Sequence, residues 1–362
     1  MYKNPFTPVF GNEPPILAGR NNLIDDVLRG LDAGVGDPNR ITIFTGPRGS
    51  GKTVLLAKIA NEAQERGWIA VHVPAVTGML ESLKDQIDIH TAELLPRKQK
   101  SQMTGLQGAG FGITREIIKH DNLGWRAHIE KTLNLLEEMN VGLLFTIDEV
   151  SASVPEMIEF VSTFQVYIME KRNVALLMAG LPDKVLQMFQ DDSISFLRRA
   201  FRRKLDPLSN SEARAVIKKT VELSGREIDQ AALALVVDST GGFPFIIQLI
   251  GYHTFNQSDS DVISVADAKS GIDSSYVDLE SMILDSTMYS LSEMDKKFLL
   301  AMVEDEKYSL ASDIARRLGV SVNYVGTYRR RLVEQGVITP IGRGKFSFTI
   351  PIMRSMLAKM DI

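Results

Sequence analysis

The sequence contains no cysteine among its 362 residues. This excludes a disulfide scaffold, a thiolate metal site and a cysteine nucleophile, and it fits a reducing compartment. A strong charge of one sign is also lacking, because 41 Lys and Arg stand against 45 Asp and Glu, for a net charge of −4. Such mild acidity argues against uniform, charge-driven binding of nucleic acid. It leaves room for a small basic domain within the average.

Long hydrophobic runs are missing as well. Runs such as AALALVV at 231–237 fall far short of the ~18 residues that a membrane-spanning helix needs. The polar, proline-rich start, MYKNPFTPVFGNEPP, has no apolar core like that of a signal peptide. We therefore expect a cytoplasmic protein with no membrane partner.

The first half of the chain alternates short apolar runs with segments of helical spacing. Strands are predicted at 41–45, 68–75, 141–147 and 173–180. Helices are predicted at 52–65, 78–95, 124–139 and 156–172. This order implies βαβ units and a parallel sheet. The segment 95–112, rich in Gly, Gln and Lys, is predicted to be a loop or insertion, and the sequence leaves the role of 95–123 open.

The pattern changes near residue 207. Helices are predicted at 212–224, 229–238, 245–255 and 265–283, with Asn210 or Ser211 capping the first, and no strand is expected before about 337. Three domains follow from this: an α/β core at 1–206, an all-helical domain at 207–288 and a C-terminal unit at 289–362.

One motif lies between the first predicted strand and helix. Residues Gly46, Pro47, Arg48, Gly49, Ser50, Gly51, Lys52 and Thr53 satisfy the pattern G-x-x-x-x-G-K-[ST]. Its glycines let backbone N–H groups wrap a polyphosphate at the start of a helix. Lys52 is placed to reach the β- and γ-phosphates, and the Thr53 hydroxyl to ligate Mg²⁺. The alternative is a glycine-rich turn that happens to precede Lys-Thr.

A second motif follows the predicted strand at 141–147. The apolar run ends in Asp148 and Glu149. We expect this strand to lie beside the phosphate strand and to deliver its end to the ligand crevice. Asp148 would then hold Mg²⁺, and Glu149 would orient and deprotonate the attacking water. The alternative is a strand that simply ends in a charged turn.

The C-terminal unit has the pattern of a winged helix-turn-helix. Helices are predicted at 292–305, 310–318 and 322–335, followed by two strands within 337–350. DNA contacts are predicted on the outer face of the third helix and between the two strands, at Asn323, Tyr324, Thr327, Arg330, Arg331, Arg343 and Lys345. Seven basic and two acidic residues in 310–350 favour contact with double-stranded DNA.

Together these motifs resemble the AAA+ ATPases, and more narrowly the initiator branch of origin-recognition and archaeal-type ATPases with the related signal-transduction ATPases. Residues 18–23 (AGRNNL) resemble the element that lines the adenine site, and Gly242-Phe243-Pro244 resembles an element of the helical lid. The resemblance implies a P-loop core, a lid, ATP and Mg²⁺ as cofactors, and nucleotide contacts from Arg20 and Pro244.

The chain also departs from that family. The strand at 173–180 ends in Ala-Gly-Leu-Pro, where the family carries a polar residue that senses the γ-phosphate. Pro244 occupies the region where initiator ATPases carry a lid arginine. These departures favour slow hydrolysis or a nucleotide switch over a fast motor.

Arg198 and Arg199 lie where the resembled family usually carries arginine fingers. Either could reach the γ-phosphate of a neighbouring subunit in a homo-oligomer. The alternative is a solvated or DNA-facing basic surface.

Two functions remain open. The first is an ATPase whose nucleotide state controls a DNA-binding winged helix. The second is a signal-transduction switch, in which the winged helix packs on the nucleotide domain or binds a protein partner.

Overall fold

The structure is a computed structural model that describes residues 2–9, 11, 13–17, 19–94, 124–280, 282, 291–350 and 353–358. The predicted loop at 95–112, the expected end of the helix at 283 and the domain boundary at 288 lie outside the described residues, as does Ala18. In the described part of the chain, no helix is both long and apolar enough to cross a membrane.

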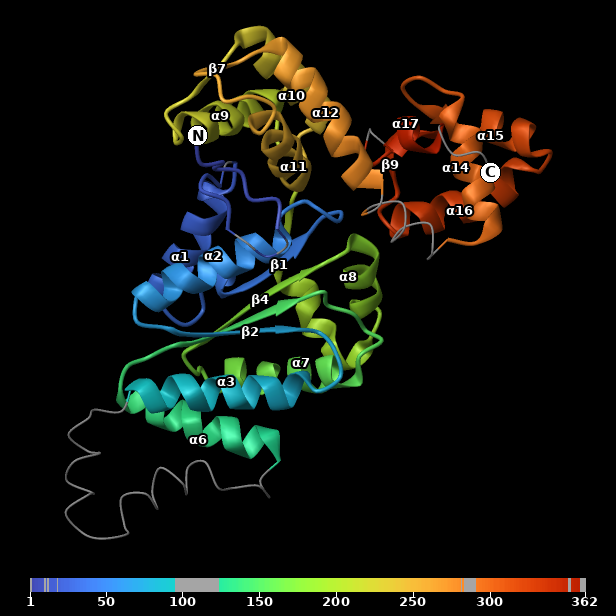
Figure 1. The fold of residues 1–362 in the computed structure, drawn as a ribbon. Coiled ribbons are helices and arrows are strands. Elements are labelled where there is room, and N and C mark those ends of the chain that lie inside the picture. The colour runs from blue at the N-terminus through green and yellow to red at the C-terminus, as the bar shows by residue number, and fades with distance from the viewer. Residues whose placement is uncertain are drawn as a thin grey trace.

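A five-stranded parallel sheet forms the centre of the first unit (Figure 1). Its order is β2 (Ile69–Pro74), β3 (Leu143–Asp148), β4 (Val174–Gly180), β1 (Ile41–Thr45) and β5 (Phe201–Lys204). The prediction that the strand ending at Asp148 lies beside the phosphate strand is wrong, because β4 pairs with both β3 and β1. Every residue of β3 and β4 is buried, as a central parallel strand requires.

Helices cover both faces of this sheet. The α-helices are α1 (Asn21–Ala33), α2 (Lys52–Glu65), α3 (Met79–Leu94), α6 (Trp125–Glu138), α7 (Pro155–Met169) and α8 (Pro182–Met188), and the 3₁₀ helices are η1 (Pro38–Arg40) and η2 (Asp192–Arg199). One apolar cluster joins α1 and α2 to one face of the sheet, and another joins α3, α6 and α7 to the opposite face. Because all five strands are parallel, their carboxyl ends lie at one edge of the sheet, between the helical layers.

The second unit is mainly helical but also contains strands, which the sequence did not predict. It consists of α9 (Asn210–Glu222), β6 (Glu227–Ile228), α10 (Gln230–Thr240), α11 (Pro244–Phe255), β7 (Val262–Ile263) and α12 (Val265–Leu279). The expectation of an all-helical domain is therefore wrong, since β6 and β7 pair in parallel. The predicted caps of the first helix are also wrong: Ser209 caps it, because its hydroxyl and Glu212 form a reciprocal capping box.

The N-terminal segment packs on this second unit. The Tyr2 hydroxyl donates to Asp261 at 2.5 Å, and the Asn4 amide donates to Tyr252 O at 2.9 Å and to Asn256 at 2.8 Å. Phe6 is buried against Gly251, where an added Cβ would lie 2.3 Å from the ring. The segment then runs back to α1, so it straps the helical unit to the core.

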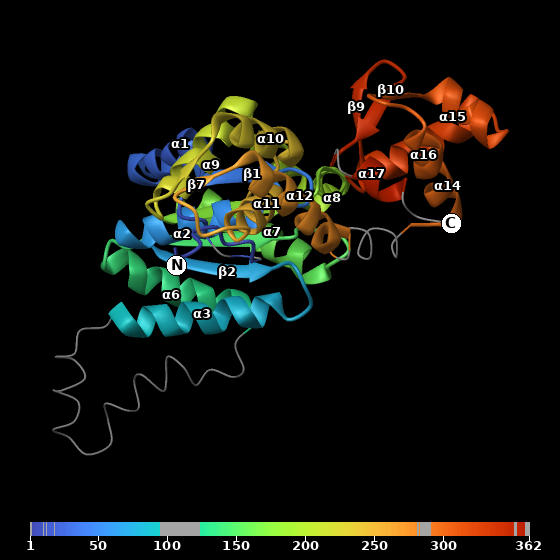
Figure 2. The ribbon, with the colours of Figure 1, turned by 45° about the horizontal axis from the view of Figure 1, so that its top comes forward.

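The C-terminal unit lies to one side of the other two (Figure 2). Its elements are α14 (Glu293–Val303), β8 (Ser309–Leu310), α15 (Ala311–Leu318), α16 (Val322–Glu334), β9 (Ile338–Gly342), β10 (Lys345–Phe348) and α17 (Met353–Leu357). The strands form an antiparallel sheet in the order β8-β10-β9. Phe298, Leu332 and Phe346 are fully buried in its core, and that core is continuous with the core of the helical unit.

Candidate active site

The predicted phosphate loop connects β1 to α2, with α2 beginning at Lys52. Gly49 and Gly51 have φ of +75° and +85°, a region that other residues rarely adopt. A Cβ on Gly46 would lie 2.7 Å from Ser50 Oγ and 2.9 Å from Leu205 O. The loop geometry therefore requires these glycines, and it leaves the N-terminal amides of α2 facing the crevice.

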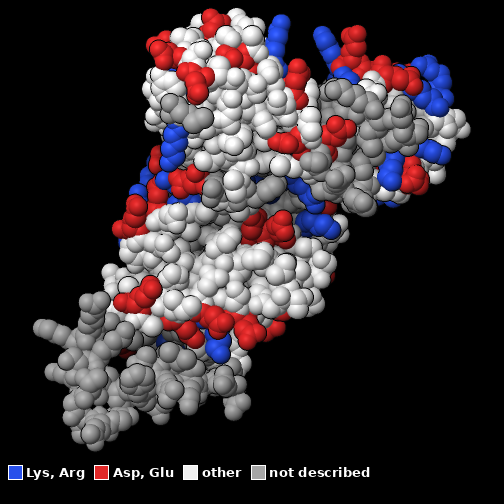
Figure 3. Space-filling model, viewed as in Figure 1, with Lys and Arg blue, Asp and Glu red and all other residues white. Residues whose placement is uncertain are grey.

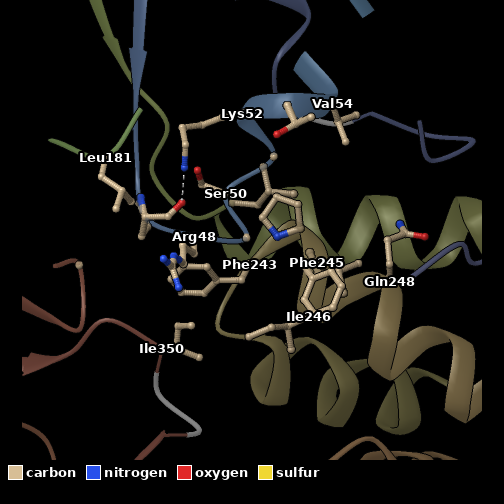
Figure 4. A pocket seen from close by; sticks show the side chains of 18 of the residues that line it. Arg48, Ser50, Lys52, Val54, Leu181, Phe243, Phe245, Ile246, Gln248 and Ile350 are labelled. Atoms are coloured by element: carbon tan, nitrogen blue, oxygen red, sulfur yellow. Dashed lines mark hydrogen bonds between the residues drawn. The ribbon is translucent and has the colours of Figure 1, made fainter. Parts of the chain in front are cut away.

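Lys52 is largely buried and folds back over this loop. Its Nζ donates to Gly46 O at 2.9 Å and to Pro47 O at 2.8 Å, and Figure 4 marks one of these bonds by a dashed line. Burial lowers the pKa of Lys52 to about 8, against the opposing influence of Asp148 and Glu149. The ammonium group is thus held at the loop. An anion bound there would supply the negative charge that stabilises the protonated form of Lys52.

The predicted acidic pair lies at the carboxyl end of β3. The Thr53 hydroxyl donates to Asp148 Oδ2, so the two predicted Mg²⁺ ligands are in contact. They meet even though β4 lies between β3, which ends at Asp148, and β1, which precedes the loop and Thr53. Asp148 is buried, and its Oδ1 accepts from Glu149 N at 2.8 Å. Glu149 is exposed and has φ of +53°, which is rare outside glycine and often marks a functional residue.

The helical unit docks directly on the phosphate loop. Phe245 N donates to Gly49 O at 3.4 Å, and the ring of Pro244 lies 3.8 Å from the position of a Cβ on Gly51. Gly242 has φ of +75° and approaches Leu208 O so closely that a Cβ would lie 2.1 Å from it. Pro244 therefore lies against the phosphate loop, and the turn that places it needs glycine.

Arg20 lies at the core side of the same crevice. Its Nη2 donates to Asp206 O at 2.6 Å, and burial lowers the pKa of its guanidinium. The residue lines the cavity described next.

A cavity of about 600 Å³ opens beside the loop. Four parts of the chain line it: the phosphate loop with α2, the N-terminal segment, α8 and α11. The C-terminal unit closes the remaining side with Arg331, Glu334, Gln335, Gly336, Val337, Ile350 and Met353. In Figure 4, Ile350 faces Arg48 of the loop from the opposite wall.

Arg331, which the sequence places on the DNA face, is also tied to its own unit. Its Nε donates to Asp295 Oδ1 at 3.0 Å and its Nη2 to Ser292 Oγ at 2.6 Å, while it also lines the cavity. Asp295 is only 1% exposed, and a buried carboxylate needs a cation. Helical spacing placed Arg331 on an outer face, but α14 packs along that side of α16.

The other predicted DNA contacts lie on the surface. Asn323, Thr327 and Arg330 line a shallow hollow on the face of α16, together with Arg329 and Pro340. Tyr324 is exposed on the same helix, and its hydroxyl bonds to that of Tyr328 at 2.8 Å.

The two predicted contacts of the hairpin lie where β9 meets β10. Arg343 is exposed, and the Lys345 ammonium lies 4.4 Å from the centre of the Tyr308 ring. Figure 3 shows Lys and Arg gathered toward the outer edge of this unit, with Asp and Glu beside them. One of the seven basic residues counted in 310–350, Arg317, pairs with Glu304 and Asp305, which lie just before that range. The net positive charge of the folded surface is therefore smaller than the count suggests.

Arg198 and Arg199 lie on η2, outside the cavity of their own chain. Both are exposed, and Arg198 donates to Phe189 O at 2.8 Å and lies 3.5 Å from Asp192. Neither lines the site formed by this chain.

Asp183 is a candidate that motif reading missed. This second residue of α8 lines the cavity, is 8% exposed, and has an Oδ1 with no hydrogen-bond partner in the described structure. Burial raises the pKa of its carboxyl. The signal in the sequence was an acidic residue three positions after β4, the strand that ends without the expected polar side chain.

We expect Asp183→Asn to stabilise the protein at neutral pH by on the order of 1 kcal/mol. The folded-state pKa lies above the unfolded value, so ionisation penalises folding once pH rises above about 4, and the penalty grows up to the folded pKa. Thermal unfolding at pH 4.5 and 7.5 measures this. Asp25→Asn, on the exposed face of α1, is the control. An equal change in melting temperature at both pH values would contradict the argument.

The sheet, its flanking helices and the loop at 46–53 fit the core of a P-loop nucleoside triphosphatase. Residues 36–189 match the family model described as AAA domain, and residues 281–357 match one described as a domain of unknown function, DUF8462. A comparison with curated proteins found no match.

Several solved structures share the fold over nearly the whole chain. A Walker-type ATPase of Pyrococcus abyssi is 14% identical with a TM-score of 0.68, covering 94% of this chain and 96% of its own. The ORC2 protein of Aeropyrum pernix is 14% identical with a TM-score of 0.65, covering 97% and 96%. Cdc6p of Pyrobaculum aerophilum is 16% identical with a TM-score of 0.51, covering 97% and 96%. This chain thus shares the fold of these structures over nearly its whole length.

Proposed function

We propose that the protein binds ATP with Mg²⁺ in the cavity and hydrolyses it slowly. Lys52 and the loop amides hold the phosphates, and Glu149 is the base that activates water. The neighbour from Aeropyrum pernix, whose structure is of ADPNP and ADP complexes, supports a nucleotide as the ligand.

The oxygens of Thr53 and Asp148 fit Mg²⁺, which prefers hard oxygen ligands and retains several waters. Within the described ranges, no three His, Cys, Asp or Glu side chains cluster as a metal site. The protein would therefore supply two ligands, and the ion would neutralise phosphate charge when bound. The second oxygen of Asp148 accepts a hydrogen bond from Glu149 N, and this bond would hold the proposed base near the proposed Mg²⁺ ligand.

We further propose that residues 1–206, 207–288 and 289–362 are three domains, and that the last is a winged helix that binds double-stranded DNA. The observation that carries this proposal is the position of α16. One side of the helix lines the cavity through Arg331 and Glu334, while another side exposes Asn323, Thr327 and Arg330. A single rigid element thus joins the nucleotide cavity to a polar and basic surface.

This placement supports control of DNA binding by nucleotide. A ligand can shift the C-terminal unit only if its contacts differ between two arrangements. Loss of the γ-phosphate would change the charge facing Arg48 and Arg331, which lie on opposite walls of the cavity. The switch would then act by moving α16 as a body.

A phosphate-release assay with and without duplex DNA tests the proposal as a whole. We expect slow release that changes when DNA is added. Release without any response to DNA, together with no DNA binding, would favour the second function: a switch whose C-terminal unit acts on the nucleotide domain or on a protein. This alternative is supported by the C-terminal unit, whose residues line part of the cavity.

Reversing the charge of Arg330 and Arg343 together is expected to weaken DNA binding at least tenfold and to reduce its salt dependence. In the described structure, both side chains are exposed and without an ion-pair partner. Fluorescence anisotropy with labelled duplex at several salt concentrations measures this. Reversal of Lys218 and Lys219, exposed on α9, is the matched control, because it makes the same change in net charge. Equal loss in both double variants would mean that α16 and its hairpin are not the DNA surface.

Homo-oligomerisation belongs to this proposal as well. Arg198 and Arg199 are exposed on η2 and do not line the cavity of their own chain, so we propose that they act on the site of a neighbouring copy. ATP-dependent assembly measured by light scattering would test this.

A further inference from the structure

Four helices in the described part of the chain carry a glycine in their interior, and packing explains three of these glycines. A Cβ would lie 2.7 Å from another side chain at Gly30 of α1, 2.3 Å from one at Gly251 of α11, and 2.4 Å from a backbone atom at Gly271 of α12. The fourth glycine is Gly326 of α16, where a Cβ would meet no atom within 4 Å. Close packing within the described structure therefore does not explain the glycine at 326.

A glycine in the interior of α16 lowers the stability of the helix. Glycine is less favourable inside a helix than every residue except proline, because it loses the most conformational freedom on folding. The backbone at Gly326 does not require glycine either, since α16 runs unbroken from Val322 to Glu334 and Gly326 has no positive φ. Alanine would fit both the space and the dihedral angles. A residue that opposes stability in this way is expected at a functional surface.

Gly326 lies on an open face of the helix. It lines the shallow hollow on α16, together with Val322, Asn323, Thr327, Arg329, Arg330, Val333 and Pro340. The helical members of this set recur at spacings of three and four residues, so they share one face of α16. Because Gly326 has no side chain, the backbone of the helix is accessible in the middle of that face.

The chemistry around Gly326 fits nucleic acid. Arg329 and Arg330 have neither an ion-pair nor a hydrogen-bond partner in the described structure, and the described lining of the hollow contains no acidic residue. Asn323 and Thr327 supply an amide and a hydroxyl one helical turn apart, and Val322 is 52% exposed at the start of α16. Amide, hydroxyl and guanidinium groups bond to base edges, and an apolar side chain contacts the methyl group of thymine.

A helix fits the major groove of DNA tightly. The groove is about 12 Å wide, and a helix with its side chains is about 10–12 Å across. A position without a side chain on the face that enters the groove lets the axis of the helix lie deeper. Short side chains beside that position then reach the bases. Asn323 and Thr327, which lie beside Gly326 on α16, are short in this sense.

We propose that Gly326 is the point of closest approach between α16 and the base edges of duplex DNA, and that it sets sequence specificity by letting Asn323 and Thr327 reach those edges. This rests on the proposed DNA-binding function. Arg330 and Arg343 then contact phosphates, which position the helix without reading sequence. A side chain at 326 would lift the helix from the floor of the groove, so contacts to bases would be lost before contacts to phosphates.

The test uses the full-length protein and a duplex that the wild-type protein selects from a random-sequence pool. Fluorescence anisotropy compares the affinity for this duplex with the affinity for a duplex of the same composition in shuffled order. We expect Gly326→Ala to lower the preference for the selected duplex at least about threefold, and Gly326→Met at least roughly tenfold. The affinity for the shuffled duplex, which depends on phosphate contacts, should change by less than about twofold.

The stability of the same variants should change in the opposite direction. Alanine and methionine are better helix formers than glycine, so the melting temperature should rise by roughly 2–4 °C. Ala231→Met is the control for added bulk, because Ala231 is exposed on α10 of the helical unit. It should leave the preference between the two duplexes unchanged. Lost preference in a more stable protein would separate a role in recognition from a role in packing.

The outcomes separate this inference from the function on which it rests. If the wild-type protein binds no duplex at all, the DNA-binding function itself is wrong and the C-terminal unit serves the second function. If it binds duplex but enriches no sequence, or if both Gly326 variants keep the wild-type preference, DNA binding stands and the role of Gly326 is overturned. The role is also overturned if the variants melt below the wild-type protein, or if Ala231→Met loses as much preference as Gly326→Met.

Discussion

Lys52→Ala is expected to reduce ATP affinity at least roughly 100-fold. The ammonium group is the one cation that the phosphate loop itself bonds, through Gly46 O and Pro47 O among the described residues. Without it, the phosphates would face the loop amides alone, in a buried setting where an unpaired charge is costly. Titration of the protein with a fluorescent ATP analogue measures the change.

Lys58→Ala is the control for this variant. Lys58 lies on the same helix, on its outer side, where it pairs with Glu13 and Glu62. Its loss should leave ATP affinity within about twofold, since exposed ion pairs contribute little. If Lys52→Ala bound ATP as well as the wild-type protein, the assignment of the phosphate loop would fail.

Glu149→Gln is expected to retain ATP and to lower the rate of phosphate release by roughly 10²- to 10⁴-fold. Glutamine keeps the shape of the side chain but cannot take a proton from water. The residue is exposed at the carboxyl end of β3 and is fixed by Glu149 N donating to Asp148, so the backbone that places it does not depend on its charge. Single-turnover phosphate release and an ATP titration measure the two effects separately.

The control is Glu138→Gln, which makes the same change on the exposed face of α6. It should leave both rate and affinity unaltered. Normal phosphate release by Glu149→Gln would show that another group activates the water. Asp183, which lines the cavity and has one buried oxygen without a partner in the described structure, would then be the first candidate.

The phosphate loop and the two acids at the end of β3 could be placed from sequence because each depends on neighbours in the chain. A strand, a glycine-rich loop and a helix follow one another within 41–65, so local spacing determines how they connect. The predicted strand and helix positions in the core are accordingly close to those observed.

The errors concern contacts between residues distant in sequence. Nothing near 148 indicates that β4 inserts between β3 and β1, because strand order depends on how helices pack across the sheet. Arg331 has the spacing of an outer residue, and nothing near it in the sequence indicates its bond to Asp295, 36 residues away. Asp183 belongs to no motif, and its burial depends on segments far from it in the chain.

The strap formed by the N-terminal segment has a consequence for biosynthesis. Tyr2 is 259 residues from its partner Asp261, and Thr7 is 241 residues from Gln248. At a synthesis rate of about 5–20 residues per second, the first residues leave the ribosome roughly 10 to 50 seconds before those partners. Phe6 must remain uncovered for that time, since the surface that buries it does not yet exist. The core can fold meanwhile, whereas the wall of the cavity that α11 supplies forms only after the helical unit is complete.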